Sequence, residues 1–425
     1  MTKVREAAHT VALIDDYCAH YRELFANVRH FEQFTALHLG LLAETKRKSL
    51  PRLAKTAKAD AQALHHFLAN AEWSVEELQE RRLALLRAAL QGRAFVLCID
   101  ETGDRKKGHT TDYVAHQYIG NIGGLANGVV SVNAYGILDG TPFPLAFRVY
   151  KPKTRLKPGD VFKSKPQLAI ELIQELQALG FHFSVVLADS MYGESWDFTH
   201  ALHRLDLLYV VAIRSNHVVW LPPGEHKRYN RWHTFDRHFA DGTSAPRFIR
   251  EVVFGRRAGY RERFFQITTD PVRQPPETTW YIASNLPGKI EQQVGDTYGW
   301  RTWIEYGFKQ AKDELGWADY RVTDYHAIER WWELVMSVAT FVALQSPAFA
   351  PDAAPAADSL LLAHPHWDGG PGWKRTLNNL RLLLQPYVCA CLLLPWLRVH
   401  PLPHLTAGLA DLCALMNTYH PLLPK

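Results

Sequence analysis

The chain has 425 residues, which is enough for two or three domains. Apolar residues make up 47% and charged residues 21% of it, and these ordinary values for a soluble globular protein exclude wholesale disorder. Apolar runs such as those at 207–213 and 388–397 fall short of the roughly 18 residues that span a bilayer, and the N-terminal residues do not resemble a signal peptide. We therefore expect a cytoplasmic protein with no membrane partner.

The five cysteines do not form a C-x-x-C pair, so a zinc ribbon and a disulfide framework are both poorly supported. Reduced, buried thiols are the expected state of Cys18, Cys98, Cys389, Cys391 and Cys413.

The net charge is only +5, but the basic residues are concentrated in three blocks. Residues 46–58 contain six basic residues and no acid, residues 148–165 contain seven against one acid, and residues 227–263 contain ten against four acids. The last block is interleaved with aromatic residues. A single basic block is usually a solvated face, whereas three separate blocks favour a polyanionic partner such as nucleic acid.

Residues 1–92 have helical periodicity throughout, and Ser74 with Glu77 forms a capping box at the start of a helix over 78–90. Ser49 can cap a short helix, and Asp60 can start another that runs to position 69. Two short helices behind a basic run are compatible with a helix-turn-helix, although a plain helical bundle with a basic surface stays open. The candidate DNA contacts in this region are Lys46, Arg47, Lys48 and Lys55.

The periodicity then changes to that of an α/β layer. We expect strands at 94–100, 128–138 and 143–150, a helix at 165–179, a strand at 184–189, a helix at 196–205 and a strand at 207–213. Three strands joined by short turns, followed by alternating helices and strands, predict a mixed sheet with flanking helices.

The rest of the chain divides by composition. Residues 215–285 predict a β-rich insertion domain between a first core part at 93–214 and a second core part at 286–346. Residues 347–372, rich in Ala, Pro, Asp and Gly, predict a linker, and residues 373–425 predict a C-terminal helical region.

Two acids, Asp100 and Asp189, end apolar strands that are expected to be neighbours. A single acid at a strand end usually serves a turn or a cap, but two on adjacent strands could hold divalent cations, which need a further carboxylate from a helix nearby. Glu305 fits that role, and Arg301 and Lys312 share its helix face. The alternative is that Arg301 and Glu305 form an ordinary surface ion pair.

At this point the sequence resembles a known family, the DDE transposases of bacterial insertion sequences, and among them the insertion-sequence 701 type. Three motifs carry the resemblance. They are Ile99-Asp-Glu-Thr-Gly-Asp-Arg-Lys-Lys-Gly108 with His116-Gln-Tyr-Ile-Gly-Asn-Ile-Gly123; Leu187-Ala-Asp-Ser-Met-Tyr-Gly193; and the Tyr-(2)-Arg-(3)-Glu-(6)-Lys pattern formed by Tyr298, Arg301, Glu305 and Lys312. The resemblance covers residues 20 to 345, and Glu101 and His116 depart from the family pattern without removing a carboxylate.

The resemblance implies an RNase H-like catalytic core and an all-helical N-terminal DNA-binding domain. It implies that Asp100, Asp189 and Glu305 hold two Mg²⁺ ions, for which Mn²⁺ could substitute, and that Tyr298, Arg301 and Lys312 contact DNA phosphates. It also implies cut-and-paste transposition by a homodimer that binds double-stranded DNA, both the terminal inverted repeats of the element and the target, at the bacterial nucleoid.

Four further residues are candidate DNA contacts. Trp220 or Trp232 of the insertion could stack on a flipped base, with a role in the core of a small β-domain as the alternative. Lys106 and Lys107 could contact DNA, or could be ordinary lysines of an exposed loop.

Two other functions stay open at this stage. The chain could be a domesticated, sequence-specific DNA-binding regulator, although clustered carboxylates with no metal to bind would repel one another. It could also be a stand-alone metal-dependent DNA nuclease. Strand joining separates the three, because a regulator only binds, a nuclease cuts, and a transposase cuts and joins.

Overall fold

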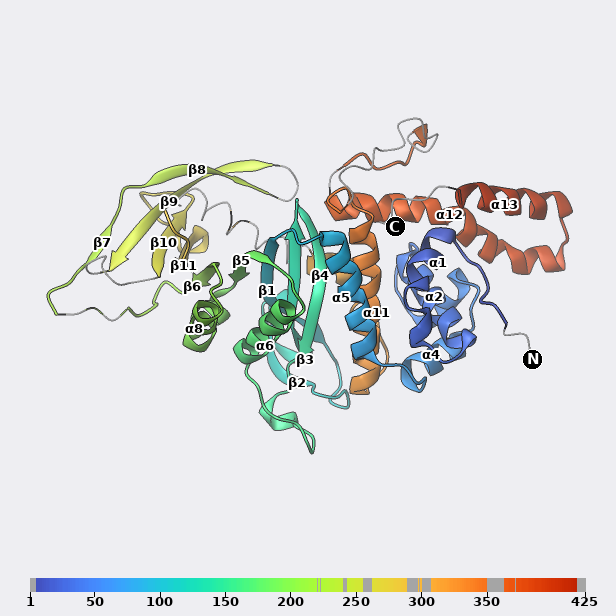
Figure 1. Ribbon diagram of the computed structural model, residues 1–425, viewed down its shortest axis with the longest axis horizontal. Coiled ribbons are helices and arrows are strands. Elements are labelled where there is room, and N and C mark those ends of the chain that lie inside the picture. The colour runs from blue at the N-terminus through green and yellow to red at the C-terminus, as the bar shows by residue number, and fades with distance from the viewer. Residues whose placement is uncertain are drawn as a thin grey trace. The chain divides into compact units, whose positions relative to one another are not determined.

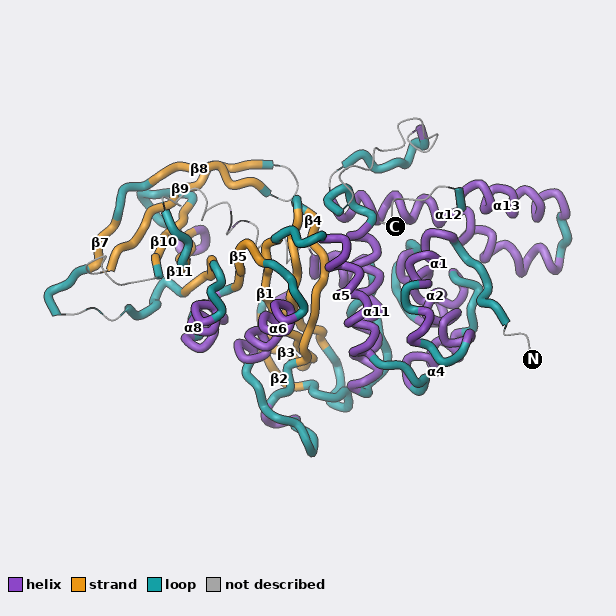
Figure 2. Tube along the Cα trace, in the orientation of Figure 1, coloured by secondary structure: helices purple, strands orange, loops and turns teal. Residues whose placement is uncertain are grey.

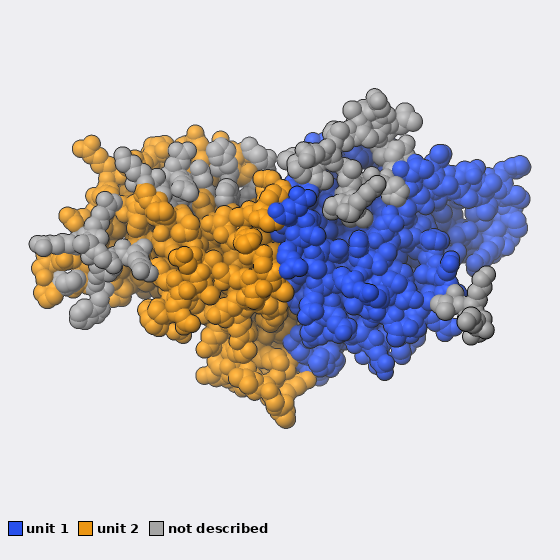
Figure 3. All heavy atoms as spheres, in the orientation of Figure 1, with its two compact units in different colours: residues 1–91, 110–112, 308–425 blue, residues 92–109, 113–307 orange. Residues whose placement is uncertain are grey.

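The computed structural model describes residues 5–219, 221, 223–239, 243–254, 262–288, 297, 299, 307–349, 363–370 and 372–418 (Figures 1 and 2). By its internal contacts the chain divides into two compact units, coloured separately in Figure 3. We call Met1–Gln91, Thr110–Asp112 and Phe308–Lys425 the helical unit, and Gly92–His109 and Tyr113–Gly307 the sheet unit.

The helical unit joins both ends of the chain. Its described elements are α1 (Ala12–Ala19), η1 (Arg22–Leu24), α2 (Val28–Leu42), α3 (Leu50–Thr56), α4 (Ala61–Ala69), α5 (Val75–Leu90), the π-helical turn η5 (Gln310–Glu314), α11 (Tyr325–Leu344), α12 (Gly372–Val399) and α13 (Pro403–Met416). The side chains of Asp60 and Ser74 cap α4 and α5 by accepting backbone N–H groups, as the sequence predicts. Helices follow Ser49, Asp60 and Ser74 as predicted, but the Ser49 side chain makes no cap hydrogen bond, and only the Ser74 half of the predicted capping box is present.

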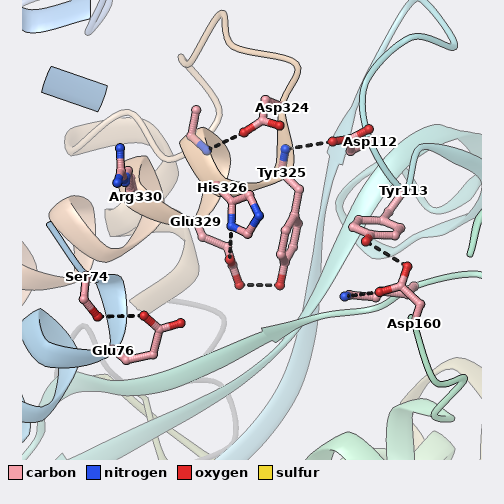
Figure 4. Close-up of polar contacts among 12 residues, drawn as sticks. Ser74, Glu76, Asp112, Tyr113, Asp160, Asp324, Tyr325, His326, Glu329 and Arg330 are labelled. Atoms are coloured by element: carbon pink, nitrogen blue, oxygen red, sulfur yellow. Dashed lines mark hydrogen bonds and ion pairs between the residues drawn. The ribbon is translucent and has the colours of Figure 1, made fainter. Parts of the chain in front are cut away.

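Helix α11 forms the core of this unit, although the sequence analysis assigned it to the catalytic core. Its residues are almost all buried, and it packs on α5, α2 and α4. Arg82 of α5 and Glu333 of α11 form a fully buried ion pair at 2.5 Å. The segment Thr110–Asp112 joins the same unit, because Asp112 accepts the N–H of Tyr325 at the start of α11, over 2.9 Å (Figure 4). A long apolar helix therefore gathers chain segments that are remote in sequence.

Helix α12 is longer and more apolar than the short apolar runs in the sequence led us to expect. It is 28 residues long, and an 18-residue window of it reaches a mean hydropathy of 1.6, so by length and composition it could cross a membrane. Core helices of soluble proteins pass the same test, and α12 contains Pro386 and Pro395. Only 17% of the window is buried. All five cysteines are free as expected, but Cys389 on this helix is exposed rather than buried.

The sheet unit is built on one mixed sheet with flanking helices. Its strands are β1 (Phe95–Arg105), β2 (Ala115–Ile119), β3 (Gly124–Leu138), β4 (Thr141–Val149), β5 (Phe183–Ala188), β6 (Tyr209–Ile213), β7 (Lys227–Tyr229), β8 (His233–His238), β9 (Ser244–Phe254), β10 (Arg263–Thr268) and β11 (Thr279–Ser284). Its helices are η2 (Gly120–Ile122), η3 (Lys153–Arg155), α6 (Lys165–Ala178), α7 (Ser190–Gly193), α8 (Trp196–Arg204) and η4 (Pro276–Thr278).

The strand order at the centre of the sheet is β2-β3-β1-β5-β6, and β4 also pairs with β3. Strand β1 runs antiparallel to β3 and parallel to β5, and β5 runs parallel to β6. Three antiparallel strands followed by two parallel ones confirm the predicted mixed sheet of an RNase H-like core.

Strand β1 is longer than predicted, and β2 is absent from the sequence prediction. The sequence Glu101-Thr-Gly-Asp-Arg105 is polar and contains Gly, so its local propensity favours a loop. In the structure it continues the ladder with β3 as far as the pair Arg105 and Gly128. Pairing with a long neighbouring strand therefore overrides the local preference.

The predicted β-rich insertion is not a separate domain by its backbone pairing. Its strand β11 pairs with β6 of the core, and the order continues β6-β11-β10-β9-β7, with β8 paired to β9. The insertion therefore continues the central sheet through hydrogen bonds. Figure 1 shows its strands on the β6 side of that sheet.

Candidate active site

Asp100 and Asp189 lie side by side where β5 ends beside the middle of β1. The last registered pair between the parallel strands β1 and β5 is Ile99 with Ala188, and each aspartate is the next residue along its strand. Neighbouring strands are about 4.8 Å apart. Asp100 is 9% exposed, and Asp189 is half-buried. The predicted adjacency of these two carboxylates is confirmed.

The motif after Asp189 has a clear steric reason. Asp189 caps the single-turn helix α7, and its Oδ1 accepts the N–H of Met191 at 2.9 Å. Gly193 ends this turn against β6, where a Cβ atom would lie 2.0 Å from the carbonyl oxygen of Ala212. Only glycine fits there. The Asp-x-x-x-Gly spacing therefore fixes the backbone that carries the second carboxylate.

Tyr192 and Lys165 both contact Glu101, the residue after the first carboxylate. The fully buried Tyr192 donates its hydroxyl hydrogen to Glu101 Oε2 at 3.4 Å, and the Lys165 ammonium lies 3.1 Å from Oε1. Lys165 is placed by the capping box of Ser164, which starts α6. Sequence reasoning assigned no role to Lys165 or Tyr192, because only the fold brings them to this carboxylate.

The negative charges of Asp100, Glu101 and Asp189 lie close enough together to influence one another and Tyr192. Burial raises the pKa of Glu101, the nearby Lys165 opposes that change, and the charge of Asp189 adds to it. Burial also raises the pKa of the Tyr192 hydroxyl well above its ordinary value, and the negative charges of Glu101, Asp100 and Asp189 reinforce the rise. Tyr192 is therefore a neutral hydrogen-bond donor in the middle of three acids.

The third motif lies mostly outside the described residues, because these include none of Tyr298, Arg301 and Glu305. Gly307, two residues after Glu305, is described. A Cβ atom on Gly307 would lie 3.1 Å from the ring of Tyr135 on β3. Tyr135 and Asn133 share one face of β3, and Asn133 pairs directly with Asp100. The chain just after Glu305 therefore passes over the face of the sheet to which Asp100 belongs.

Lys312 belongs to η5 of the helical unit, where it is half-buried. The π-helical turn Gln310–Glu314 directly continues the third motif. Such turns are rare, and proteins frequently have them at functional sites.

The described residues fit a divalent cation in their chemistry. Asp100 and Asp189 supply hard, anionic oxygen atoms from rigid neighbouring strands, which suits Mg²⁺ or Mn²⁺. Within the described ranges, no three His, Cys, Asp or Glu side chains form a metal-binding group, so a further carboxylate is needed.

A pocket of about 400 Å³ opens beside the second carboxylate. It is lined by Asp189, Ser190, Ala212, Ile213, Ser215, Gln274, Pro276, Thr279, Trp280 and Tyr281. Sequence reasoning missed Trp280 and Tyr281, although two adjacent aromatic residues in a predicted β-rich region are a signal for a stacking surface. Trp220 lies outside the described residues. Trp232 stacks on the guanidinium of Arg250, 4.3 Å from the ring centre, and is half-buried.

The predicted basic contacts separate into exposed and buried residues. In the helical unit, Lys46, Arg47 and Lys55 are exposed, but Lys48 is 2% exposed. The Lys48 ammonium donates to the carbonyl of Ala43, and burial, together with the nearby charge of Arg381, lowers its pKa to about 7. The structure therefore contradicts a direct phosphate contact by Lys48, because its charge does not reach the surface.

The two loop lysines after β1 also differ. Lys106 forms an ion pair with the buried Asp104 at 2.6 Å, and its side chain is 16% exposed. Lys107 is exposed. Of the two, Lys107 is the more accessible to DNA.

Comparison with known proteins agrees with this geometry. The sequence profile of the DDE superfamily endonucleases matches residues 21–252 of the chain. The chain is also 50% identical over 331 residues to a probable transposase for insertion sequence element IS701 from Microchaete diplosiphon, and this match covers 77% of the chain and 87% of the relative. The chain therefore belongs to the DDE superfamily of endonucleases, among the transposases related to that of IS701.

Proposed function

We propose that this protein binds the terminal inverted repeats of its own insertion sequence and catalyses their cleavage and transfer into target DNA. The observation that carries the proposal is the adjacency of Asp100 and Asp189 on parallel strands, with the chain after Glu305 passing over the same face. The high identity to a probable IS701 transposase across most of the chain supports the same function.

In this proposal Asp100, Asp189 and Glu305 hold two divalent cations, with Mg²⁺ as the physiological ion and Mn²⁺ as a substitute. DDE superfamily endonucleases generally depend on divalent metals. When bound, such metals would activate a water molecule or a 3′-hydroxyl for in-line attack on the phosphodiester, and would stabilise the leaving oxygen.

The other residues position the carboxylates and the DNA. Tyr192 and Lys165 hold Glu101, and through it the middle of β1, against the turn that carries Asp189. Arg301 and Lys312, with Tyr298, contact the phosphates near the scissile bond. These contacts hold the backbone without reading sequence. A homodimer is expected to bring two element ends together.

The pocket beside Asp189 gives the DNA strand room for one nucleotide. Trp280 and Tyr281 offer aromatic surfaces for stacking, and Gln274 offers an amide for hydrogen bonds. Trp232 is the weaker candidate for stacking on a flipped base, because Arg250 already covers its ring.

The test is a Mg²⁺-dependent cleavage and strand-transfer assay on DNA that carries the element's own ends. The wild type is compared with Glu305→Ala and with Asp313→Ala, which removes an exposed acid from the neighbouring turn. We expect joined products from the wild type and Asp313→Ala, and none from Glu305→Ala, which should still bind the ends. Cutting without joining would indicate a nuclease instead, and binding alone a DNA-binding regulator.

A further inference from the structure

Asn133 is a buried polar residue directly opposite the first carboxylate. In the antiparallel pair of β1 and β3, Asn133 is the registered partner of Asp100. Directly opposite residues of an antiparallel pair project to the same face, with Cβ atoms about 4.5–5.5 Å apart. Asn133 is only 1% exposed, so its amide group cannot reach bulk water.

The orientation of the Asn133 amide is fixed by its neighbour Ser131. The amide nitrogen lies 2.9 Å from the carbonyl oxygen of Ser131 and 3.0 Å from its hydroxyl oxygen. A carbonyl oxygen can only accept a hydrogen bond, so the amide nitrogen, and not the amide oxygen, must face Ser131. The amide oxygen is therefore turned away from Ser131.

This amide oxygen has no hydrogen-bond partner among the residues that the structure describes. A buried polar atom without a partner costs about 1–3 kcal/mol, so such atoms are rare in folded proteins. Its closest cross-strand neighbour, the carboxylate of Asp100, is also an acceptor and cannot satisfy it. The two residues share one face of the sheet, and two oxygen acceptors on neighbouring strands of one face favour a positive charge beside them.

We infer that the amide oxygen of Asn133 is a neutral ligand of the cation that Asp100 holds, either directly or through a water molecule bound to that cation. Amide oxygen atoms are common ligands of hard divalent cations. This inference rests on the proposed metal-dependent function of Asp100, and it adds a ligand from β3, a strand that carries none of the three acids. It also explains why a buried asparagine lies on this part of β3 with its amide oxygen unpaired among the described residues.

The test measures Mn²⁺ binding to the full-length protein without DNA, by isothermal titration calorimetry, so that it does not depend on activity. Asn133→Leu keeps the side-chain size and removes the oxygen, and we expect its Kd for Mn²⁺ to rise roughly tenfold. Asn133→Asp keeps an oxygen and adds a charge, so its Kd should equal that of the wild type or fall below it. Circular dichroism checks the fold of each variant.

Two reference variants separate this inference from its alternatives. Ser131→Ala removes a hydroxyl from the same buried face but keeps the backbone carbonyl of residue 131, which still orients the Asn133 amide, so this variant should bind Mn²⁺ like the wild type. Asp100→Asn should lose Mn²⁺ affinity; if it does not, the proposed metal site itself is wrong.

The inference alone is overturned if Asp100→Asn loses affinity while folded Asn133→Leu binds like the wild type. It is also overturned if Ser131→Ala loses as much affinity as Asn133→Leu, because the effect would then come from disturbed packing. If Asn133→Leu does not fold, Asn133→Asp decides, and a loss of affinity in this folded variant contradicts the inference.

Discussion

The hydroxyl group of Tyr192 donates a hydrogen bond to Glu101 that joins the turn after β5 to the middle of β1. Tyr192 follows Asp189 by three residues, and Glu101 directly follows Asp100. The contact therefore restrains the distance between the two aspartates, because it links the residues that follow each of them. Because the spacing of metal ligands tolerates only small errors, such a contact influences catalysis without touching DNA.

Tyr192→Phe removes this hydrogen bond and keeps the ring, which packs on Phe198. We expect the single-turnover cleavage rate to fall roughly tenfold, and half-saturation to need more Mg²⁺, because the two carboxylates become less well fixed. Tyr113→Phe is the matched control, since it removes a hydroxyl that bonds Asp160 in the same unit (Figure 4). Equal Mg²⁺ requirements in the wild type and Tyr192→Phe would contradict the positioning role.

The two tryptophans of the extended sheet should differ in their effect. Trp280 lines the pocket beside Asp189, and the guanidinium of Arg237 lies 5.8 Å from its ring centre. Trp232 is covered more closely, because Arg250 lies 4.3 Å from its ring centre. Stacking of a base on an aromatic ring contributes about 1–3 kcal/mol, so Trp280→Ala should lower cleavage roughly tenfold or more. Trp232→Ala should change it much less. Rate measurements on the same end DNA decide the matter, and a larger loss in Trp232→Ala would favour the original sequence-based prediction.

The basic segment behind α2 offers a matched pair of lysines. Lys55 is exposed on α3, while Lys48 is buried with its ammonium on the carbonyl of Ala43. If Lys55 contacts a phosphate, Lys55→Ala should reduce the slope of log Kd against log salt by about 0.9. Lys48→Met should leave that slope unchanged. Fluorescence anisotropy between low and high salt measures both slopes, and no change in Lys55→Ala would exclude the contact.

The stability of the helical unit should depend on pH through His38. Its Nδ1 donates to the carbonyl of Phe34 at 2.9 Å, and its Nε2 lies 2.8 Å from the hydroxyl oxygen of Ser337, from which it accepts when the ring is neutral. Burial lowers the pKa of His38 to about 4. The unfolded chain therefore binds a proton below pH 6.5 that the folded chain does not, and the free energy of unfolding falls as the pH drops from 6.5 to 4.

The expected loss across this window is about 3 kcal/mol. Urea denaturation at pH 7.5 and pH 4.5 measures it. His38→Gln should make the free energy of unfolding depend less on pH. His404→Gln, which replaces an exposed histidine, should leave the dependence unchanged. If the dependence is equally steep in His38→Gln, another group is responsible.

The sequence predicted the parts of this site that local patterns determine. Asp100 and Asp189 could be identified because an acid that follows an apolar run can be recognised in the sequence alone. The pairing of β1 with β5 confirms that the two aspartates are neighbours. Lys165 and Asn133 could not be identified, because their importance comes from pairings with residues that lie 64 and 33 positions away in the chain.

The accessibility of Lys48 and the packing of α11 could not be predicted, for related reasons. Lys48 belongs to a basic run that is typical of a DNA-binding surface, but the chain buries it against Gly316, where a Cβ atom would lie 2.5 Å from the lysine side chain. Helix α11 was assigned to the catalytic core because it follows the third motif. Its apolar surface instead packs on helices near the N-terminus. Neither partner is visible in the local sequence.

The hydrogen bonding of β11 to β6 limits how this enzyme can be altered. Removing the strands from β7 to β11 would leave β6 with a free edge, which invites pairing with another chain and aggregation. The same ladder makes β6 a shared support, because β6 also pairs with β5, whose end carries Asp189. Backbone hydrogen bonds therefore connect the outer strands to the strand that carries the second carboxylate, and we expect chimeras that exchange this region between relatives to need the β6–β11 register.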